Sequence, residues 1–223
     1  MAYFLQDQAV PQGSRTVSVN IPSNWESQSA CVEVFQVKPE SQEWTLVTEK
    51  FTSGMPIVIK QVTRIQNLWL WEAYCFNKYR MVKKNSGVHN ELILYHGTKE
   101  NDPMAICKGE DGFDLRLGNK GSWGTALYFS ESVCYADRFA HITSEGDREI
   151  LVASVLVGEA YDFGTVHSKD LRMPPVRETS KENLENIKYD SVSAITKDTR
   201  VYMLYEMNKA YPVYIVRYQY HRL

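Results

Sequence analysis

The sequence lacks the residue clusters that identify several common classes of protein. Its four cysteines, Cys31, Cys75, Cys107 and Cys134, form no CxxC pair, and none lies near a histidine at zinc-finger spacing. No apolar run approaches the ~20 residues that a membrane-spanning helix needs. The stretch 1–13 does not combine a basic segment with an apolar one, as a signal peptide does. Scattered cysteines in such a chain indicate reduced thiols and an intracellular protein.

A strong net charge is also missing. The chain has 25 lysines and arginines against 27 aspartates and glutamates, a formal net charge of -2. No field of the whole chain therefore attracts nucleic acid or an anionic membrane. The basic stretch from Arg80 to Asn85 is typical of a solvated helix end. We expect neither nucleic acid nor a membrane as a partner, and we expect the chain to be a monomer.

What the sequence does contain is enough apolar material for a core. Hydrophobic residues make up 43% of the 223 residues and aromatic residues 12%, which suits one domain of moderate size. Residues 1–18 are polar and aperiodic, and they predict a loose lead-in. The ordered domain is expected over 19–223.

The amino-terminal half predicts a mixture of helices and strands. Asn20 and Ser23 are both suitable helix caps where the ordered part begins. Another predicted helix opens with a capping serine, Ser41, and closes on Gly54. Alternation and helical spacing predict strands over 30–38 and 56–66, and helices over 41–54 and 68–85.

From Glu91 onward short β-branched and aromatic runs dominate. They predict strands over 91–97, 126–129, 148–158, 191–197, 200–208 and 211–220. Two short helices are predicted between them, over 102–109 and 130–141. The last two strands are separated by a few residues around Asn208, which predicts an antiparallel hairpin. The polar stretch 164–186 predicts a long surface loop. The fold class is therefore α+β, with helices first and a largely antiparallel β core.

Two stretches carry the functional interest, but the residues alone favour an ordinary interpretation. His96 ends an apolar run before a Gly-Thr turn, and a buried histidine at a strand end is usually structural. Tyr128 and Phe129, which follow a glycine-rich turn, fit ordinary core aromatics. The glycine spacing comes with no Walker lysine, and no G-x-S-x-G motif is present. Cys107 and Cys134 have no obvious basic partner that would activate a thiol.

Taken together, five stretches point further. They are LILYHGT (92–98), GFDLRLGNKGSWGTALYF (112–129), REILVASVLVGEAYDFG (148–164), KYDSVSA (188–194) and AYPVYIVRY (210–218). In this order they resemble the catalytic domain of the poly(ADP-ribose) polymerases. The upstream stretch 64–81 resembles the helix before that core in the mono-ADP-ribosylating branch. The resemblance, over about 20–220, implies a diphtheria-toxin-like ADP-ribosyltransferase fold: two small, mainly antiparallel sheets facing each other around a cleft for NAD+.

The resemblance also implies the site residues. The family uses a His-Tyr-Glu triad and NAD+ as co-substrate, without a metal. His96 matches the histidine that hydrogen-bonds the adenosine ribose, and Tyr128 matches the tyrosine that flanks the nicotinamide ring. Gly97 matches the residue whose backbone clamps the nicotinamide amide. The other matching positions are Thr98 and Arg116 on the adenosine or pyrophosphate side, and Tyr135, Ala136 and Phe139 near the nicotinamide.

Two positions depart from the family pattern. Val201 stands where the catalytic glutamate is expected, and Glu206 is five residues too far along the strand to replace it. Aliphatic residues at this place are found in the mono-ADP-ribosylating branch, so a His-Tyr-Val set implies transfer of single units. Ala136 stands where a serine usually binds the nicotinamide amide. Ser130 or Ser132 would compensate in part if the helix started elsewhere.

The sequence leaves three functions open. The first is an NAD+-dependent mono-ADP-ribosyltransferase of the cytoplasm or nucleus, acting on protein acceptors or on itself. The second is an inactive member of the same fold that serves as a binding or interaction module, which Ala136 and Val201 motivate. The third is transfer to nucleic acid ends, which the near-neutral charge disfavours.

Overall fold

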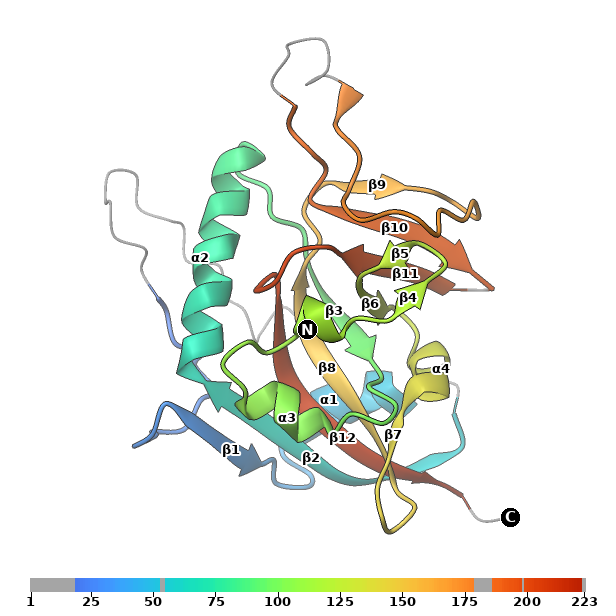
Figure 1. The fold of residues 1–223 in the computed structure, drawn as a ribbon. Helices are drawn as coiled ribbons and strands as arrows, with labels where there is room; N and C mark the ends of the chain where they lie inside the picture. The colour runs from blue at the N-terminus through green and yellow to red at the C-terminus, as the bar shows by residue number, and fades with distance from the viewer. Residues whose placement is uncertain (1–18, 53–54, 179–185, 198, 222–223) are drawn as a thin grey trace.

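A computed structural model describes residues 19–52, 55–178, 186–197 and 199–221 (Figure 1). The lead-in predicted over 1–18 lies outside these residues. In chain order the strands are β1 (Val32–Gln36), β2 (Ile57–Asn67), β3 (Glu91–His96), β4 (Lys120–Gly121), β5 (Gly124–Thr125), β6 (Leu127–Ser130), β7 (His141–Ile142), β8 (Arg148–Leu156), β9 (Ala160–Asp162), β10 (Ser191–Thr196), β11 (Thr199–Leu204) and β12 (Ala210–Tyr220). The helices are α1 (Gln42–Thr52), α2 (Leu68–Lys84), α3 (Pro103–Lys108) and α4 (Val133–Ala136), with single 3₁₀ turns at Leu115–Leu117 and Asp137–Phe139.

The main sheet consists of two halves. Its strand order is β1-β2-β12-β8-β3-β6-β11-β10-β9, with β7 beside β8. All the pairs are antiparallel except β9 with β10. β3 and β6 are paired in register at one position, Tyr95 opposite Ser130, whereas β3 and β8 are paired at six positions. This arrangement confirms the predicted α+β fold class, and the two expected sheets meet at the β3–β6 junction.

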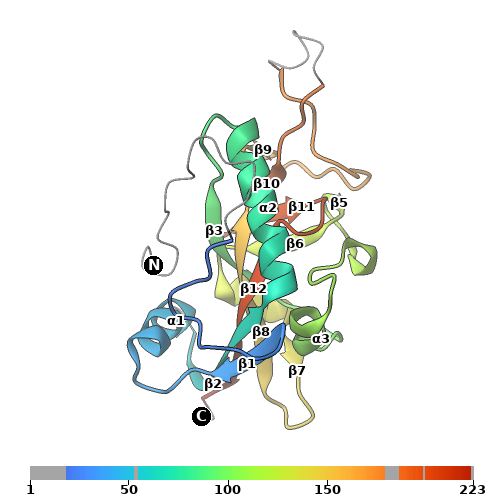
Figure 2. The ribbon, with the colours of Figure 1, turned by 90° about the vertical axis from the view of Figure 1, so that its left-hand side faces the viewer.

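The first half of the sheet is covered on both faces. Figure 2 shows α1 and α3 on opposite sides of β8 and β12. On one face Phe51 of α1 packs with Tyr95 and Tyr218, and on the other Cys107 of α3 packs with Leu94 and other core residues. Because side chains alternate along a strand, neighbouring residues of β3 and β8 enter different cores. A sheet buried on both faces explains the continuous apolar run in β8.

The helices begin where the sequence provides caps. Ser41 accepts a hydrogen bond from the Trp44 amide at 3.1 Å, and α1 begins at the next residue, as predicted. Asn67 caps α2 in the same way, and Asp102 caps α3, with a proline at its first position. Within the described residues no helix has the length and apolarity to cross a membrane.

The helix start predicted at Asn20 or Ser23 is wrong. The chain there forms a turn and an irregular segment, because β2 and α2 bind its backbone. The indole of Trp71 donates to the carbonyl of Asn20 at 3.0 Å. The amide of Glu26 donates to the side chain of Gln66 at 2.8 Å. These bonds replace the helical ones.

The hairpin predicted around Asn208 is also wrong. β11 pairs with β6 and β10, whereas β12 pairs with β2 and β8. Residues 205–209 therefore carry the chain from one half of the sheet to the other, and the hairpin is β10–β11 instead. Of the surface loop predicted over 164–186, the described part forms no strand and has one isolated bridge, Val176 to Lys188.

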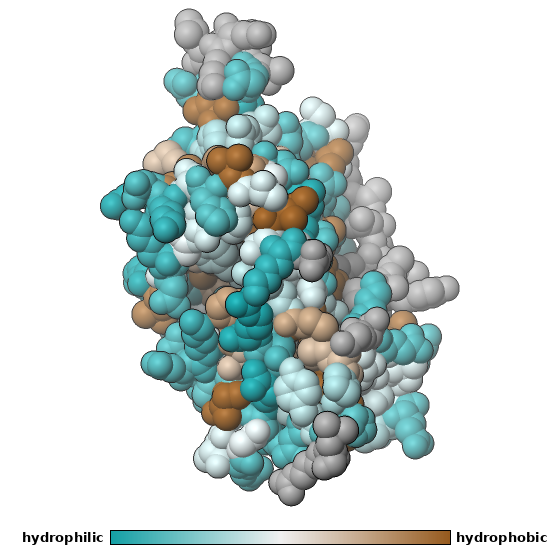
Figure 3. Space-filling model, turned by 90° about the vertical axis from the view of Figure 1, so that its right-hand side faces the viewer, coloured by the Kyte–Doolittle hydropathy of each residue, from teal (hydrophilic) through white to brown (hydrophobic). Residues whose placement is uncertain are grey.

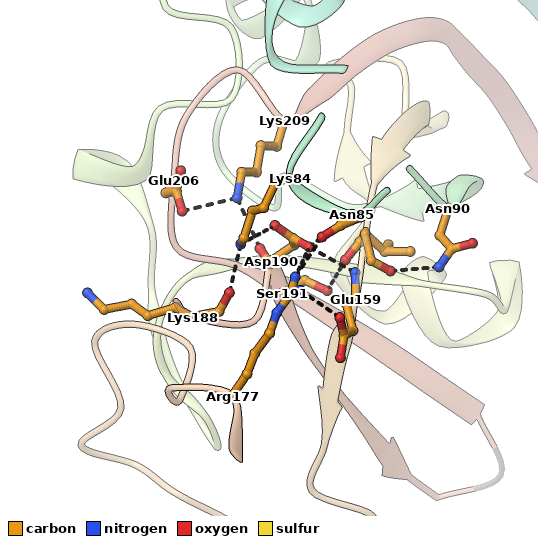
Figure 4. A network of polar contacts seen from close by, with 12 residues as sticks. Lys84, Asn85, Asn90, Glu159, Arg177, Lys188, Asp190, Ser191, Glu206 and Lys209 are labelled. Atoms are coloured by element: carbon orange, nitrogen blue, oxygen red, sulfur yellow. Dashed lines mark hydrogen bonds and ion pairs between the residues drawn. The ribbon is translucent and has the colours of Figure 1, made fainter. Parts of the chain in front are cut away.

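A buried carboxylate ties α2 to the second half of the sheet (Figure 4). Asp190 accepts hydrogen bonds from Lys84 at 2.6 Å, Asn85 at 2.8 Å, the Glu159 amide at 2.9 Å and Arg177 at 3.0 Å. Its side chain is 2% exposed. Burial alone would raise the pKa of Asp190, but these hydrogen bonds and the Lys84 charge outweigh it and lower the pKa. The carboxylate is therefore ionised and fully engaged.

Candidate active site

A cleft of about 490 Å³ lies where the two halves of the sheet meet. Its walls come from the end of β3, the segment that follows it, the strands β6 and β11, and α4 with the 3₁₀ turn that follows. The structure brings together eight of the nine predicted site residues around it: His96, Gly97, Thr98, Tyr128, Tyr135, Ala136, Phe139 and Val201. Residues far apart in sequence thus form one concave site.

His96 is held at the centre of an aromatic group. Its Nδ1 lies 2.7 Å from the carbonyl oxygen of Tyr128. A carbonyl can only accept, so Nδ1 carries the proton and Nε2 of the neutral ring is an acceptor. Phe113 and Phe129 lie 5.2 Å from the imidazole, centroid to centroid. Burial lowers the pKa of His96, and the bond to the Tyr128 carbonyl opposes this only in part.

The lowered pKa of His96 predicts a loss of stability in acid. The unfolded chain takes up a proton near pH 6.5, where folded His96 does not, so the free energy of unfolding falls as the pH drops below about 6.5. We expect His96→Gln to flatten this fall between pH 7 and 5 in urea unfolding experiments. His221→Gln, at an exposed histidine, is the control and should keep the wild-type slope. Equal slopes in all three proteins would contradict the prediction.

Gly97 allows two parts of the backbone to touch. A Cβ atom on Gly97 would lie 2.3 Å from the carbonyl oxygen of Phe139 and 2.8 Å from that of Ala136. Only glycine fits this close approach. The next residue, Thr98, donates its hydroxyl to the carbonyl of Asn101 at 2.5 Å. The turn after β3 is therefore packed tightly against the segment that carries Ala136 and Phe139.

The ring of Tyr128 forms another wall of the cleft, and its hydroxyl is fixed by hydrogen bonds to backbone groups. The hydroxyl accepts from the Trp123 amide at 3.0 Å and donates to the Gly124 carbonyl at 2.8 Å. A Cβ atom on Gly121 would lie 2.6 Å from it, so a glycine is needed there too. Burial raises the pKa of Tyr128. The β4–β5 hairpin thus sets the orientation of the ring.

The third wall carries two aromatic rings. Tyr135 and Phe139 lie 5.6 Å apart, centroid to centroid, and the ammonium of Lys99 lies 5.1 Å from the Phe139 centroid. Of the two serines considered as substitutes near Ala136, Ser130 lines the cleft. Ser132 caps α4 by accepting from the Tyr135 amide at 3.3 Å.

Val201 gives its part of the cleft an apolar lining. It lies opposite Ser130 in the β6–β11 pair and is 2% exposed. Glu206 lies beyond the end of β11, where it pairs with Lys209 at 3.0 Å. Among the described residues, the acidic side chains that line the cleft are Asp102 and Asp114, from the segment between β3 and β4. No residue of β11 carries a carboxylate.

Arg116 is the predicted site residue that the structure places apart. It does not line the cleft, and its guanidinium pairs with Asp114 at 2.8 Å and with Asp111. Three cleft residues that the sequence did not single out are Lys99, Phe113 and Trp123. Phe113 and Trp123 lie inside the glycine-rich stretch 112–129, which was the available signal.

This fold, with its cleft at the junction of two half-sheets, is consistent with the ADP-ribosyltransferase class. A model of the poly(ADP-ribose) polymerase catalytic domain matches residues 40–220. The chain therefore belongs to the poly(ADP-ribose) polymerase catalytic-domain family. Its similarity to known proteins runs along most of its length, as three of them show.

Human protein mono-ADP-ribosyltransferase PARP12 is 31% identical over 206 residues, which cover 89% of this chain and 28% of that protein. Mouse protein mono-ADP-ribosyltransferase PARP11 is 30% identical over 241 residues, 96% of this chain and 67% of that protein. Human protein mono-ADP-ribosyltransferase PARP14 is 27% identical over 209 residues, 90% of this chain and 11% of that protein. The chain thus spans between about a tenth and two thirds of these relatives.

Proposed function

We propose that this chain transfers single ADP-ribose units from NAD+ to protein acceptors, itself included, and releases nicotinamide. Family membership supports the use of NAD+, and relatives named as protein mono-ADP-ribosyltransferases support transfer of single units. The observation that carries the proposal is the cleft itself. It brings His96 and Gly97, at the end of β3, together with Tyr128 of β6, beside an apolar Val201.

In this reaction the protein contributes mainly by positioning the reactants, and less by acid or base catalysis. The bond between nicotinamide and ribose breaks with oxocarbenium character on the sugar, as in glycoside hydrolysis. The ring nitrogen takes both electrons of that bond and leaves as a neutral base, so no acid has to protonate it. The acceptor oxygen or other nucleophile then bonds to the anomeric carbon and loses its proton. The neutral Nε2 of His96 serves as an acceptor for a ribose hydroxyl, and Tyr128 and Phe139 wall the nicotinamide.

The valine at position 201 explains why, in this proposal, no second ADP-ribose is added to the first. Extension requires a carboxylate that activates a hydroxyl of the ADP-ribose already attached. A valine side chain accepts no hydrogen bond, and this one is buried among apolar neighbours. The acceptor then has to supply its own base, which fits a single transfer.

Ala136→Ser is expected to lower the KM for NAD+ roughly fivefold, because one neutral hydrogen bond contributes about 1 kcal/mol. Ala136 lines the cleft, and its backbone carbonyl lies beside Gly97, which is why a hydroxyl added at this position is expected to reach the nicotinamide amide. Steady-state nicotinamide release at varied NAD+ measures the change. Ala140→Ser, in the same segment but outside the cleft, is the control. An unchanged KM for Ala136→Ser would contradict the proposed place of the nicotinamide.

The proposal is tested by intact-mass spectrometry and nicotinamide release after incubation with NAD+. Wild type should gain discrete increments of one ADP-ribose, and both His96→Ala and Tyr128→Ala should lose them. His221→Ala and Tyr202→Phe are matched controls outside the cleft and should keep wild-type activity. If wild-type protein releases no nicotinamide above buffer, with or without added protein acceptors, the proposed transferase activity is refuted.

A second function, an inactive module that binds NAD+ or ADP-ribose, is favoured by Val201 and Ala136 alone. It predicts a rise in melting temperature with NAD+ or ADP-ribose but no turnover.

For either function we propose the cytoplasm or nucleus as the location, on the basis of the scattered cysteines. Cell fractionation tests that proposal, and recovery in the secreted fraction would contradict it.

A further inference from the structure

A buried aspartate lies directly behind one wall of the cleft. Asp137 follows Ala136, the last residue of α4, and begins the 3₁₀ turn that ends at Phe139. Asp137 is 8% exposed, and it does not line the cleft, whereas Ala136 and Phe139 do. Its side chain points into the protein, toward β8 and β12, whose residues bind it.

The carboxylate of Asp137 joins this wall to two strands. Oδ1 accepts from Nε of Arg148 on β8 at 2.7 Å and from the hydroxyl of Tyr218 on β12 at 2.6 Å. Oδ2 accepts from the hydroxyl of Tyr220 at 2.7 Å. Arg148 also donates to the backbone carbonyl of Asp137 at 2.7 Å. Burial, and then the carboxylate itself, raises the pKa of Tyr220 to about 12, so that hydroxyl is a donor at neutral pH.

The wall depends on such an anchor. α4 has four residues, too few to be stable as an isolated helix, and the 3₁₀ turn has no side-chain cap. Yet the carbonyls of Ala136 and Phe139 are held where they exclude any side chain on Gly97. The Phe139 carbonyl also accepts from the Lys99 amide at 2.8 Å. The contact between the wall and the turn after β3 therefore requires a fixed segment.

We propose that Asp137 is a positioning residue for the nicotinamide end of the cleft. Through Arg148, Tyr218 and Tyr220 it fixes the distance between the Phe139 ring and Gly97, and it touches no substrate itself. The inference rests on the proposed function, because it assigns the nicotinamide to the space between these residues. The adenosine end depends instead on His96 at the end of β3, whose ring is held by the carbonyl oxygen of Tyr128 and not by Asp137.

Removing the charge of Asp137 should weaken one end of the site selectively. In Asp137→Asn one oxygen is replaced by an NH2 group, so the three donors around it compete for a single acceptor. The wall then loses its fixed position. Loss of stacking on Phe139 corresponds to about three- to tenfold weaker binding of a nicotinamide mimic. Misplaced reacting groups lower kcat/KM by up to about a hundredfold.

The experiment compares two ligands on the whole chain. Calorimetric titration gives the Kd of 3-aminobenzamide, a neutral nicotinamide mimic, and the Kd of ADP-ribose, which lacks the nicotinamide. Tyr220→Phe is the mild variant: Tyr220 is 44% exposed, and the change removes one hydroxyl. Glu43→Gln is the matched control. Its carboxylate also bonds an arginine and a tyrosine of the sheet, Arg64 at 2.7 Å and Tyr214 at 2.9 Å, but α1 does not reach the cleft.

We expect Asp137→Asn and Tyr220→Phe to weaken 3-aminobenzamide binding in that order of severity and to leave the Kd of ADP-ribose unchanged. Glu43→Gln should change neither Kd, although it too loses stability. Equal weakening of both ligands, or wild-type affinity for 3-aminobenzamide in Tyr220→Phe, would overturn the positioning role. Nicotinamide release by wild type reports separately on the proposed function. A wild type that binds neither ligand refutes both.

Discussion

Gly97→Ala is expected to reduce NAD+-dependent nicotinamide release about a hundredfold. The added Cβ atom would lie 2.3 Å from the carbonyl oxygen of Phe139, a distance that non-bonded carbon and oxygen atoms do not tolerate. The obstacle is backbone, so the turn after β3 or the opposite wall has to move. Displacement of a site by about 1 Å costs about a hundredfold in rate, and overpacking of this kind lowers the free energy of unfolding by about 1–3 kcal/mol.

The loss of activity has to be separated from the loss of stability. Gly87→Ala provides the comparison, since a Cβ atom on Gly87 meets nothing within 4 Å, while its φ of +104° makes alanine strained. This control should lose about 1–2 kcal/mol through backbone strain and keep its turnover. Initial rates together with urea unfolding decide the matter. Wild-type rates in the Gly97→Ala variant would show that activity does not depend on the close contact between Gly97 and the Phe139 carbonyl.

Asp190→Ala is expected to lower the free energy of unfolding by about 3–5 kcal/mol, because removing one partner of a buried ion pair leaves uncompensated charge behind. Lys84 and Arg177 both point at this carboxylate, and the Arg177 side chain is 12% exposed. With Asp190 gone, the end of α2 loses its connection to β10. Urea unfolding at pH 7 measures the effect.

A surface aspartate gives the matched control for this prediction. Asp170 pairs with Lys120 at 3.0 Å, but the two side chains are 96% and 61% exposed. Asp170→Ala should cost at most about 1 kcal/mol, as exposed ion pairs do. Similar losses for Asp190→Ala and Asp170→Ala would mean that the buried cluster in Figure 4 contributes little to stability.

Local patterns in the sequence were sufficient for most of the elements. Alternation predicted β2, helical spacing predicted α2, and Ser41 marked the start of α1 correctly. What failed were inferences that depended on distant partners. The chain around Asn20 has a helix cap by composition, but Trp71 binds its backbone. The strands on either side of Asn208 are neighbours in sequence yet belong to different halves of the sheet, and no local signal reports that.

For the candidate site, too, residues in local sequence motifs were predicted, whereas residues that depend on distant partners were not. The motif resemblance located His96, Gly97 and Tyr128, because each lies in a short recognisable stretch. Arg116 was assigned by the same resemblance, but it does not line the cleft, and its guanidinium pairs with Asp111 and Asp114. Asp137 carried no signal at all, since its partners lie on β8 and β12. Residues that support a site from behind are recognised only once the chain is folded.

The surface shows how the apolar residues are distributed. On the face in Figure 3 hydrophilic residues predominate, and the hydrophobic ones form small separate groups. Scattered apolar residues are normal on protein surfaces and indicate no docking area by themselves.

The junction of the two half-sheets has a mechanical consequence. β3 and β6 are paired in register at Tyr95 and Ser130, and the ring of His96 reaches the Tyr128 carbonyl oxygen across the same junction at 2.7 Å. Ladder hydrogen bonds therefore contribute little to holding the floor of the cleft together, and the packing of Leu94 with Phe129 completes the contact. A dinucleotide bound in the cleft is expected to tighten this junction, so amide exchange at Tyr95 and Ser130 should slow when NAD+ is added.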